Sequence, residues 1–272
     1  MTHSDPEPRR TGRAMKALGR GVRLLGYGLG TTAAALVGVL TVEVLAARLR
    51  RYARPAIGPG IRSTVGDPEA PTIRLVMLGD SFAAGVGVQS VDDSIGGHLA
   101  ALLAGDGHRI ELSSVAVSGT RSYHLDTQVS RALLGERPDV AVILVGLNDA
   151  THLVNPSEAA YHLGGAVCRL TEAGVAVVAG TCPDLAVSRA LGPPLRQIVG
   201  WLGQRIASAQ EPEVVDAGGV PVDLARRTSA VFRADPGTIC VDGFHPSADG
   251  YRIWAHALYP PVHQAVRAAK SS

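Results

Sequence analysis

Four short segments of this chain carry residue types that could together transfer an acyl group from an ester. In chain order they are Gly79-Asp80-Ser81, Ser118-Gly119-Thr120, Gly146-Leu147-Asn148-Asp149 and Asp242-Gly243-Phe244-His245. A serine becomes a nucleophile when a base takes its proton, and a histidine three positions after an aspartate supplies a base with a carboxylate to orient it. The other two segments add hydrogen-bond donors for the oxyanion that forms during attack. Each segment is weak evidence alone, and the combination predicts a hydrolytic centre.

The elements predicted between these segments would bring them to one place. Short apolar runs bounded by glycine, proline or aspartate predict strands at residues 73–78, 110–112, 140–145, 175–179 and 214–215. Helical spacing predicts helices at residues 94–103, 123–134, 157–172, 194–209 and 247–269. This alternation predicts an α/β fold in which helices cover both faces of a parallel sheet.

Ligands of such sheets bind beyond the carboxyl ends of the strands. Ser81, Gly119 and Asn148 follow the first, second and third predicted strands, and Asp242 and His245 follow the fifth. All four segments are therefore predicted to lie along one edge of the sheet, which favours a shared site over a scatter of unrelated motifs.

With these residues in view, the chain resembles the SGNH/GDSL hydrolase family of esterases, lipases and related acyl hydrolases. The resemblance covers residue 72 to about residue 269, and Phe82 stands where the family's Gly-Asp-Ser-Leu block has leucine. The tract from Gly180 to Asp184 also resembles exported actinobacterial members. The resemblance implies a flavodoxin-like three-layer α/β/α domain over residues 72–272, with a five-stranded parallel sheet.

The resemblance also implies a role for each matching residue. Ser81 is the expected nucleophile, His245 the base, and Asp242 the carboxylate that holds the imidazole in the correct tautomer. The backbone N–H groups of Ser81 and Gly119 and the side-chain amide of Asn148 are the expected oxyanion donors. The neighbours expected to form the substrate-binding walls are Phe82, Thr120, Leu147, Thr151 and Phe244.

Every segment also has an ordinary structural interpretation. Asp80-Ser81 could begin a helix, and the glycine, asparagine and aspartate positions of the other segments are typical of turns. Agreement in order and position favours catalysis, and Asp80 and Asp149 are expected to bind loop amides. The predicted function is hydrolysis of a small-molecule, lipid or glycan ester. The alternatives are an acyltransferase that passes the acyl group to a sugar or other alcohol, and a catalytically inactive, membrane-tethered binding module.

Residues 1–71 are predicted to lie outside the catalytic domain. A basic arm, residues 1–23, precedes a stretch of 19 residues, 24–42, without a charged side chain, and the apolar character continues to residue 47. At about 1.5 Å per residue this is about long enough to cross a hydrocarbon core. Residues 24–47 are therefore predicted to be a transmembrane or signal-anchor helix, with a cleaved export signal as the alternative. Residues 48–71, rich in proline and glycine, are predicted to be a linker.

Charge and cysteine content limit the partners and cofactors. The formal net charge of +2, from 26 basic and 24 acidic residues, does not favour nucleic acid. The histidines lack ligand spacing, so no metal and no other cofactor are inferred. A slight excess of basic residues before the apolar segment predicts an extracytoplasmic domain, or a secreted one if the segment is cleaved. For an exported domain, a disulfide between Cys182 and Cys240 is the hypothesis, and Cys168 is expected on a helix.

Overall fold

The computed structural model describes residues 38, 39, 41, 42, 58 and 60–271 of the 272-residue chain. The chain divides into two compact units, residues 1–50 and 51–272. No helix among the described residues is long and apolar enough to cross a membrane. All but four positions of the predicted membrane segment, residues 24–47, lie outside the described residues, so this segment stays a prediction.

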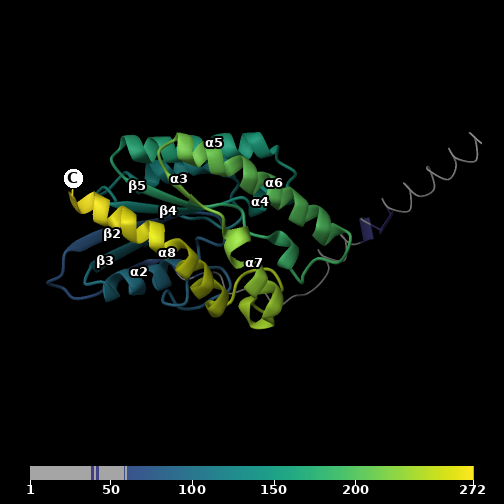
Figure 1. Cartoon of the computed structure of the whole chain (residues 1–272), viewed down its shortest axis with the longest axis horizontal. Helices are drawn as coiled ribbons and strands as arrows, with labels where there is room; N and C mark the ends of the chain where they lie inside the picture. The colour runs from purple at the N-terminus through teal and green to yellow at the C-terminus, as the bar shows by residue number, and fades with distance from the viewer. Residues whose placement is uncertain (1–37, 40, 43–57, 59, 272) are drawn as a thin grey trace, which may run out of the picture. The chain divides into compact units, whose positions relative to one another are not determined.

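A six-stranded sheet forms the centre of the second unit (Figure 1). Its strands are β1 (Arg62–Val65), β2 (Thr72–Gly79), β3 (Arg109–Ser114), β4 (Val140–Leu144), β5 (Ala176–Gly180) and β6 (Val220–Val222). Their order across the sheet is β1-β3-β2-β4-β5-β6. Strands β2 to β6 run parallel, and β1 runs antiparallel to β3. The parallel part has the flavodoxin-like order that the sequence analysis expects.

The sheet corrects the predicted five-stranded parallel sheet at two places. β1 lies inside residues 48–71, which were predicted to be a linker, and its pairing with β3 makes it part of the folded domain. The strand predicted at residues 214–215 is wrong, because these residues end helix α6 (Leu195–Asp216) and the strand is β6 instead. Val214 is buried and Val215 is exposed, as neighbours on a helix can be. A run of two apolar residues is too short to show the period that distinguishes a helix from a strand.

Helices cover both faces of the sheet and complete the three layers (Figure 1). Besides α6, the helices are α2 (Ile95–Gly105), α3 (Leu125–Ala132), α4 (Leu147–Thr151), α5 (Pro156–Glu172), α7 (Leu224–Ala234) and α8 (Ala248–Ser271), with short 3₁₀ turns η1 (Ser122–His124), η2 (Leu185–Val187) and η3 (Pro236–Thr238). Successive side chains of a strand point to opposite faces. Accordingly Leu75 and Met77 of β2 join the core beneath α2 and α8, whereas Val76 and Leu78 join the core beneath α3 and α5. The sequence analysis predicted neither α4 nor α7.

The strand order leaves a crevice at the carboxyl edge of the sheet. β2 connects to β3 on one side, while β4 lies on its other side, so the loops that follow β2 and β4 diverge. Ser81, Gly119 and Asn148 follow β2, β3 and β4 as predicted. Asp242 and His245 come after β6 as well, but α7 and η3 intervene before they return to this edge.

Candidate active site

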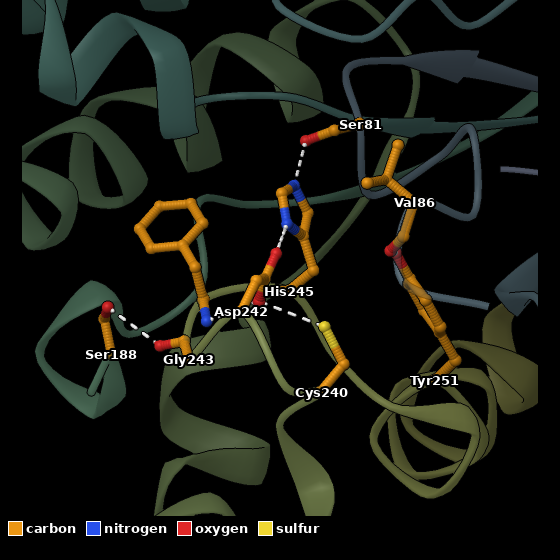
Figure 2. Close-up of polar contacts among 9 residues, drawn as sticks. Ser81, Val86, Ser188, Cys240, Asp242, Gly243, His245 and Tyr251 are labelled. Carbon is orange, nitrogen blue, oxygen red and sulfur yellow. Dashed lines mark hydrogen bonds and ion pairs between the residues drawn. The ribbon is translucent and has the colours of Figure 1, made fainter. Parts of the chain in front are cut away.

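Three polar side chains form a continuous hydrogen-bonded series at the carboxyl edge (Figure 2). The Oγ of Ser81 lies 3.0 Å from Nε2 of His245, and Nδ1 of His245 lies 2.5 Å from Oδ2 of Asp242. Ser81 and Asp242 are buried, and the His245 side chain is 14 % exposed. In this arrangement the imidazole can accept the serine proton at Nε2 while the carboxylate holds the Nδ1 proton.

The second oxygen of Asp242 is saturated with donors. Oδ1 accepts hydrogen bonds from the backbone N–H groups of Phe244 (2.8 Å) and His245 (2.9 Å) and from the thiol of Cys240 (3.0 Å). Burial by itself raises the pKa of Asp242, but the bonds from the His245 ring, the Cys240 thiol and the two amides outweigh it and lower the pKa to about 2. The carboxylate is therefore charged throughout the pH range in which an imidazole titrates.

A neighbouring loop fixes the segment that carries Asp242 and His245. The carbonyl of Gly243 accepts hydrogen bonds from Ser188 Oγ (3.2 Å) and from the backbone N–H groups of Arg189 (2.8 Å) and Ala190 (3.1 Å). Figure 2 shows the Ser188 contact beside the three aligned side chains. Sequence reasoning did not identify residues 188–190, because nothing in their local pattern reports a contact more than 50 positions away.

The turn that presents Ser81 depends on the glycine before it. Gly79 has φ 129°, and a Cβ at this position would lie 1.8 Å from the carbonyl oxygen of Leu144, so only glycine fits between β2 and β4. Oδ1 of Asp80 accepts the N–H of Phe82 at 3.0 Å, which is the loop-amide bond predicted for Asp80.

A hydrogen bond from helix α8 holds the loop that follows the same turn. The N–H of Val86 donates to the carbonyl of Ser81 at 2.9 Å, and the buried Tyr251 hydroxyl donates to the carbonyl of Val86 at 2.6 Å (Figure 2). The loop that carries Ser81 is thus tied to the last helix of the chain.

A buried glutamine that the sequence analysis missed clamps the end of β2. Oε1 of Gln128 accepts the N–H of Gly79 at 2.7 Å, and its Nε2 donates to the carbonyl of Gly79 at 2.9 Å. The Thr120 hydroxyl donates to the same carbonyl at 2.9 Å. The only local signal of this role is a polar residue on the face of α3 that otherwise buries Leu125 and Val129.

Besides the Ser81 N–H, the expected oxyanion donors come from two loops that a hydrogen bond connects. Gly119 has φ 83° and no atom lies within 4 Å of the place where a Cβ would be, so backbone conformation rather than crowding favours glycine. One N–H of the Asn148 amide donates to the Thr120 carbonyl at 2.9 Å, and the amide carries a second N–H. Asp149 accepts bonds from the N–H (3.0 Å) and hydroxyl (2.9 Å) of Ser122, which is the loop-amide role predicted for it.

The residues expected to form substrate walls divide into two groups. Phe82 and Leu147 are buried in the core, and the ring of Phe82 packs edge-on against Trp254 at a centroid distance of 5.0 Å. Thr120 and Phe244 are half-buried. Phe82, Phe244 and Trp254 line a cavity of about 20 Å³, which has room for about one water. Phe82 and Leu147 therefore pack behind Ser81, and their role as substrate-binding walls stays a prediction.

The hypothesis of a disulfide between Cys182 and Cys240 is wrong, because all three cysteines are free thiols. Cys182 is buried beside Gly146, and its N–H donates to Oε1 of Gln210 at 2.8 Å. Burial raises the pKa of both thiols, that of Cys240 to about 11, where the hydrogen bond to Asp242 contributes as well. Neither thiol is therefore prepared to act as a nucleophile at neutral pH.

Sequence comparison places this arrangement among known hydrolases. Residues 77–253 match the sequence model of the GDSL-like lipase/acylhydrolase family. A GDSL-like esterase from Mycobacterium tuberculosis, Rv1075c, is 37 % identical over 227 residues, which cover 80 % of this chain and 72 % of that protein. The chain belongs to the GDSL-like lipase/acylhydrolase family. It is accordingly a hydrolase, and the family assignment supports an ester as its substrate.

Solved structures of bacterial ester hydrolases share the fold. A lipase/acylhydrolase from Enterococcus faecalis has a TM-score of 0.55 and 20 % identity, with 71 % of this chain and 96 % of that chain covered. A catalytic mutant of Axe2, an acetylxylan esterase from Geobacillus stearothermophilus, has a TM-score of 0.54 and 18 % identity, with coverage of 73 % and 95 %. At these identities the likeness concerns the fold alone. The GDSL match at residues 77–253 contains all four of the predicted segments.

Proposed function

We propose that this GDSL hydrolase cleaves carboxylic esters through an acyl-enzyme on Ser81. The observation that carries the proposal is the uninterrupted series from Ser81 Oγ to His245 (3.0 Å) and on to Asp242 (2.5 Å). As Oγ attacks the ester carbonyl, His245 takes its proton, and the charged Asp242 stabilises the imidazolium.

The remaining steps follow from the same groups. The backbone N–H groups of Ser81 and Gly119 and the free N–H of the Asn148 amide hold the oxyanion of the tetrahedral intermediate. His245 then gives its proton to the departing alcohol, which leaves the acyl group on Ser81. Water attacks that ester with His245 again as base, and release of the carboxylic acid restores the serine hydroxyl.

We further propose that residues 24–47 hold the hydrolase at a membrane with its catalytic unit on the extracytoplasmic side, where acylated lipids or glycans are its substrates. The support is the 19-residue stretch without charge between two basic clusters. Membrane fractionation and protease protection of the full chain test this placement. Recovery of the intact chain in the soluble fraction would refute it.

The mechanism is tested by labelling the full chain with a fluorophosphonate and reading the adduct by intact mass and peptide mapping. We expect one adduct on the wild type and none on Ser81→Ala. The matched control is Ser90→Ala, at an exposed serine of the following loop, which should label like the wild type. A folded wild type that forms no adduct would refute an activated Ser81. Product analysis with added alcohols then separates hydrolysis from acyl transfer.

A further inference from the structure

Large apolar side chains that reach solvent gather at the catalytic edge. Among the described residues of the second unit, those at this edge are Val117, Tyr123, Leu153, Tyr161, Ile198, Trp201 and Val241, whereas Leu134, Val215 and Val220 lie toward the opposite edge and Val231 lies on α7. α6 begins at the carboxyl edge because it leads from the end of β5 back to the start of β6, so Ile198 and Trp201, in its first two turns, lie at this edge. Val241 directly precedes Asp242.

Leu153 is unusual in both exposure and backbone conformation. It is 73 % exposed and has φ 57°, the positive φ that bulky residues other than glycine rarely adopt. It follows α4, the short helix that carries Asn148. A strained backbone that presents an apolar side chain to water adds nothing to the core, and such outliers cluster at ligand contacts.

The charges on the α6 side of the site are of one sign. Residues 185–205 contain Arg189, Arg196 and Arg205 and no aspartate or glutamate, although the whole chain is nearly balanced. The guanidinium of Arg205 lies 5.0 Å above the ring of Trp201. On the other side of the site, the turn before α2 carries Asp92 and Asp93. Ile198 and Trp201, the exposed apolar residues in the first two turns of α6, are therefore interleaved with positive charge only, whereas Val215 near the other end of the helix lies beside Glu213 and Asp216.

These features suit an extended anionic surface better than a single polypeptide segment bound in a groove. The apolar residues come from separate loops and from α6, so they do not line one groove. The cavity beside Phe82 has a volume of only about 20 Å³. Tryptophan and leucine combined with arginine are typical of segments that lie in the headgroup region of a bilayer. We propose that an apolar rim, formed by Val117, Leu153, Ile198, Trp201 and Val241 with Arg196 and Arg205, docks the catalytic edge onto an anionic lipid surface.

The chain contains its own reporter for this docking. It has two tryptophans, Trp201, which is 54 % exposed, and Trp254, which is buried. Because neither lies in residues 1–60, tryptophan emission reports on the catalytic unit even if residues 24–47 enter the bilayer. We expect phosphatidylglycerol vesicles to shift the emission of the full chain to shorter wavelength. Phosphatidylglycerol brominated in its acyl chains should quench it, phosphatidylcholine should act more weakly, and Trp201→Phe should abolish these changes.

Two leucines provide a matched pair of variants. Leu153→Asn should lower about tenfold the affinity for phosphatidylglycerol vesicles that is read from the Trp201 emission, since it removes one large apolar contact. Asparagine accepts a positive φ more readily than leucine, so this variant should fold. Leu134→Asn, at a leucine that is 83 % exposed near the opposite edge, should bind vesicles like the wild type. Hydrolysis of a small soluble ester should be unchanged in both variants.

Three results would refute the proposal that the apolar rim docks onto an anionic lipid surface. They are unshifted and unquenched Trp201 emission, an equal loss of binding in the two leucine variants, and a Trp201 shift that depends on protein concentration without lipid, which would indicate self-association. Absence of ester hydrolysis would refute the proposed function but not the docking, because the fluorescence does not depend on turnover.

Discussion

Replacing Gln128 with methionine tests whether this side chain holds the nucleophile loop in place. Methionine has a similar length but no amide, so the variant removes both bonds to Gly79. The Gly79 carbonyl keeps two donors, the Thr120 hydroxyl at 2.9 Å and the Val117 N–H at 3.1 Å, and should lose little. The buried Gly79 N–H loses the acceptor that it now has at 2.7 Å.

An unsatisfied buried donor costs about 1 to 3 kcal/mol, so we expect the free energy of unfolding to fall by about 2 kcal/mol. For a chain of this size, that corresponds to a drop in Tm of about 4 to 8 °C. We also expect kcat/KM to fall by about tenfold or more. Gln128 holds Gly79, which lies two residues before Ser81, and the Gly79 carbonyl also binds Thr120, which follows Gly119, so a shift of Gly79 would displace both loops.

The assay is equilibrium unfolding in urea, in which the midpoint should decrease while the slope m is unchanged. Gln204→Met, at an exposed glutamine of α6, is the control and should lie within about 0.5 kcal/mol of the wild type. If Gln128→Met proved as stable as this control, the Gln128 bonds would not support β2, and the reasoning would fail.

Other positions give three further predictions. Cys240→Ala removes a donor from Asp242, so the pKa of Asp242 should rise from about 2 in a carboxylate titration followed by NMR; Cys240→Ser should restore it, and an unchanged pKa in Cys240→Ala would count against the role of the thiol. Burial, opposed by the Phe82 amide and aided by Asp149, raises the pKa of Asp80 to about 7 from 3.8, so Asp80 binds a proton in the folded chain but not in the unfolded chain between these values. Its contribution to stability is therefore lost as pH rises from about 4 to 7, and urea titrations of Asp80→Asn should show a smaller decline than those of the wild type. Gly119→Ala, at φ 83°, should cost about 1 kcal/mol of stability and lower kcat, and an unchanged kcat would argue against an oxyanion role for its N–H.

The family of this chain and the edge of the sheet at which its four segments lie could be predicted from the residues alone. The apolar runs of β2 and β4 are buried on both faces, as only strands of a sheet covered by helices are, and this pattern is local. Parallel strands end at a common edge, so the loops that carry Ser81, Gly119 and Asn148 had to converge. The spacing from Asp242 to His245 placed the imidazole and the carboxylate within one turn, again without information from distant residues.

Contacts between groups that are distant in the sequence could not be predicted from it. The strand β1 is defined by its pairing with β3, since its own four residues alternate weakly in burial. The thiols of Cys182 and Cys240 follow strands and loops at the same edge, yet one is buried against Gly146 and the other turns to Asp242, because packing and not sequence position sets side-chain direction. Gln128 reaches Gly79 across 49 positions. Contacts of this kind depend on how whole elements pack, and no periodicity or motif within a short window records them.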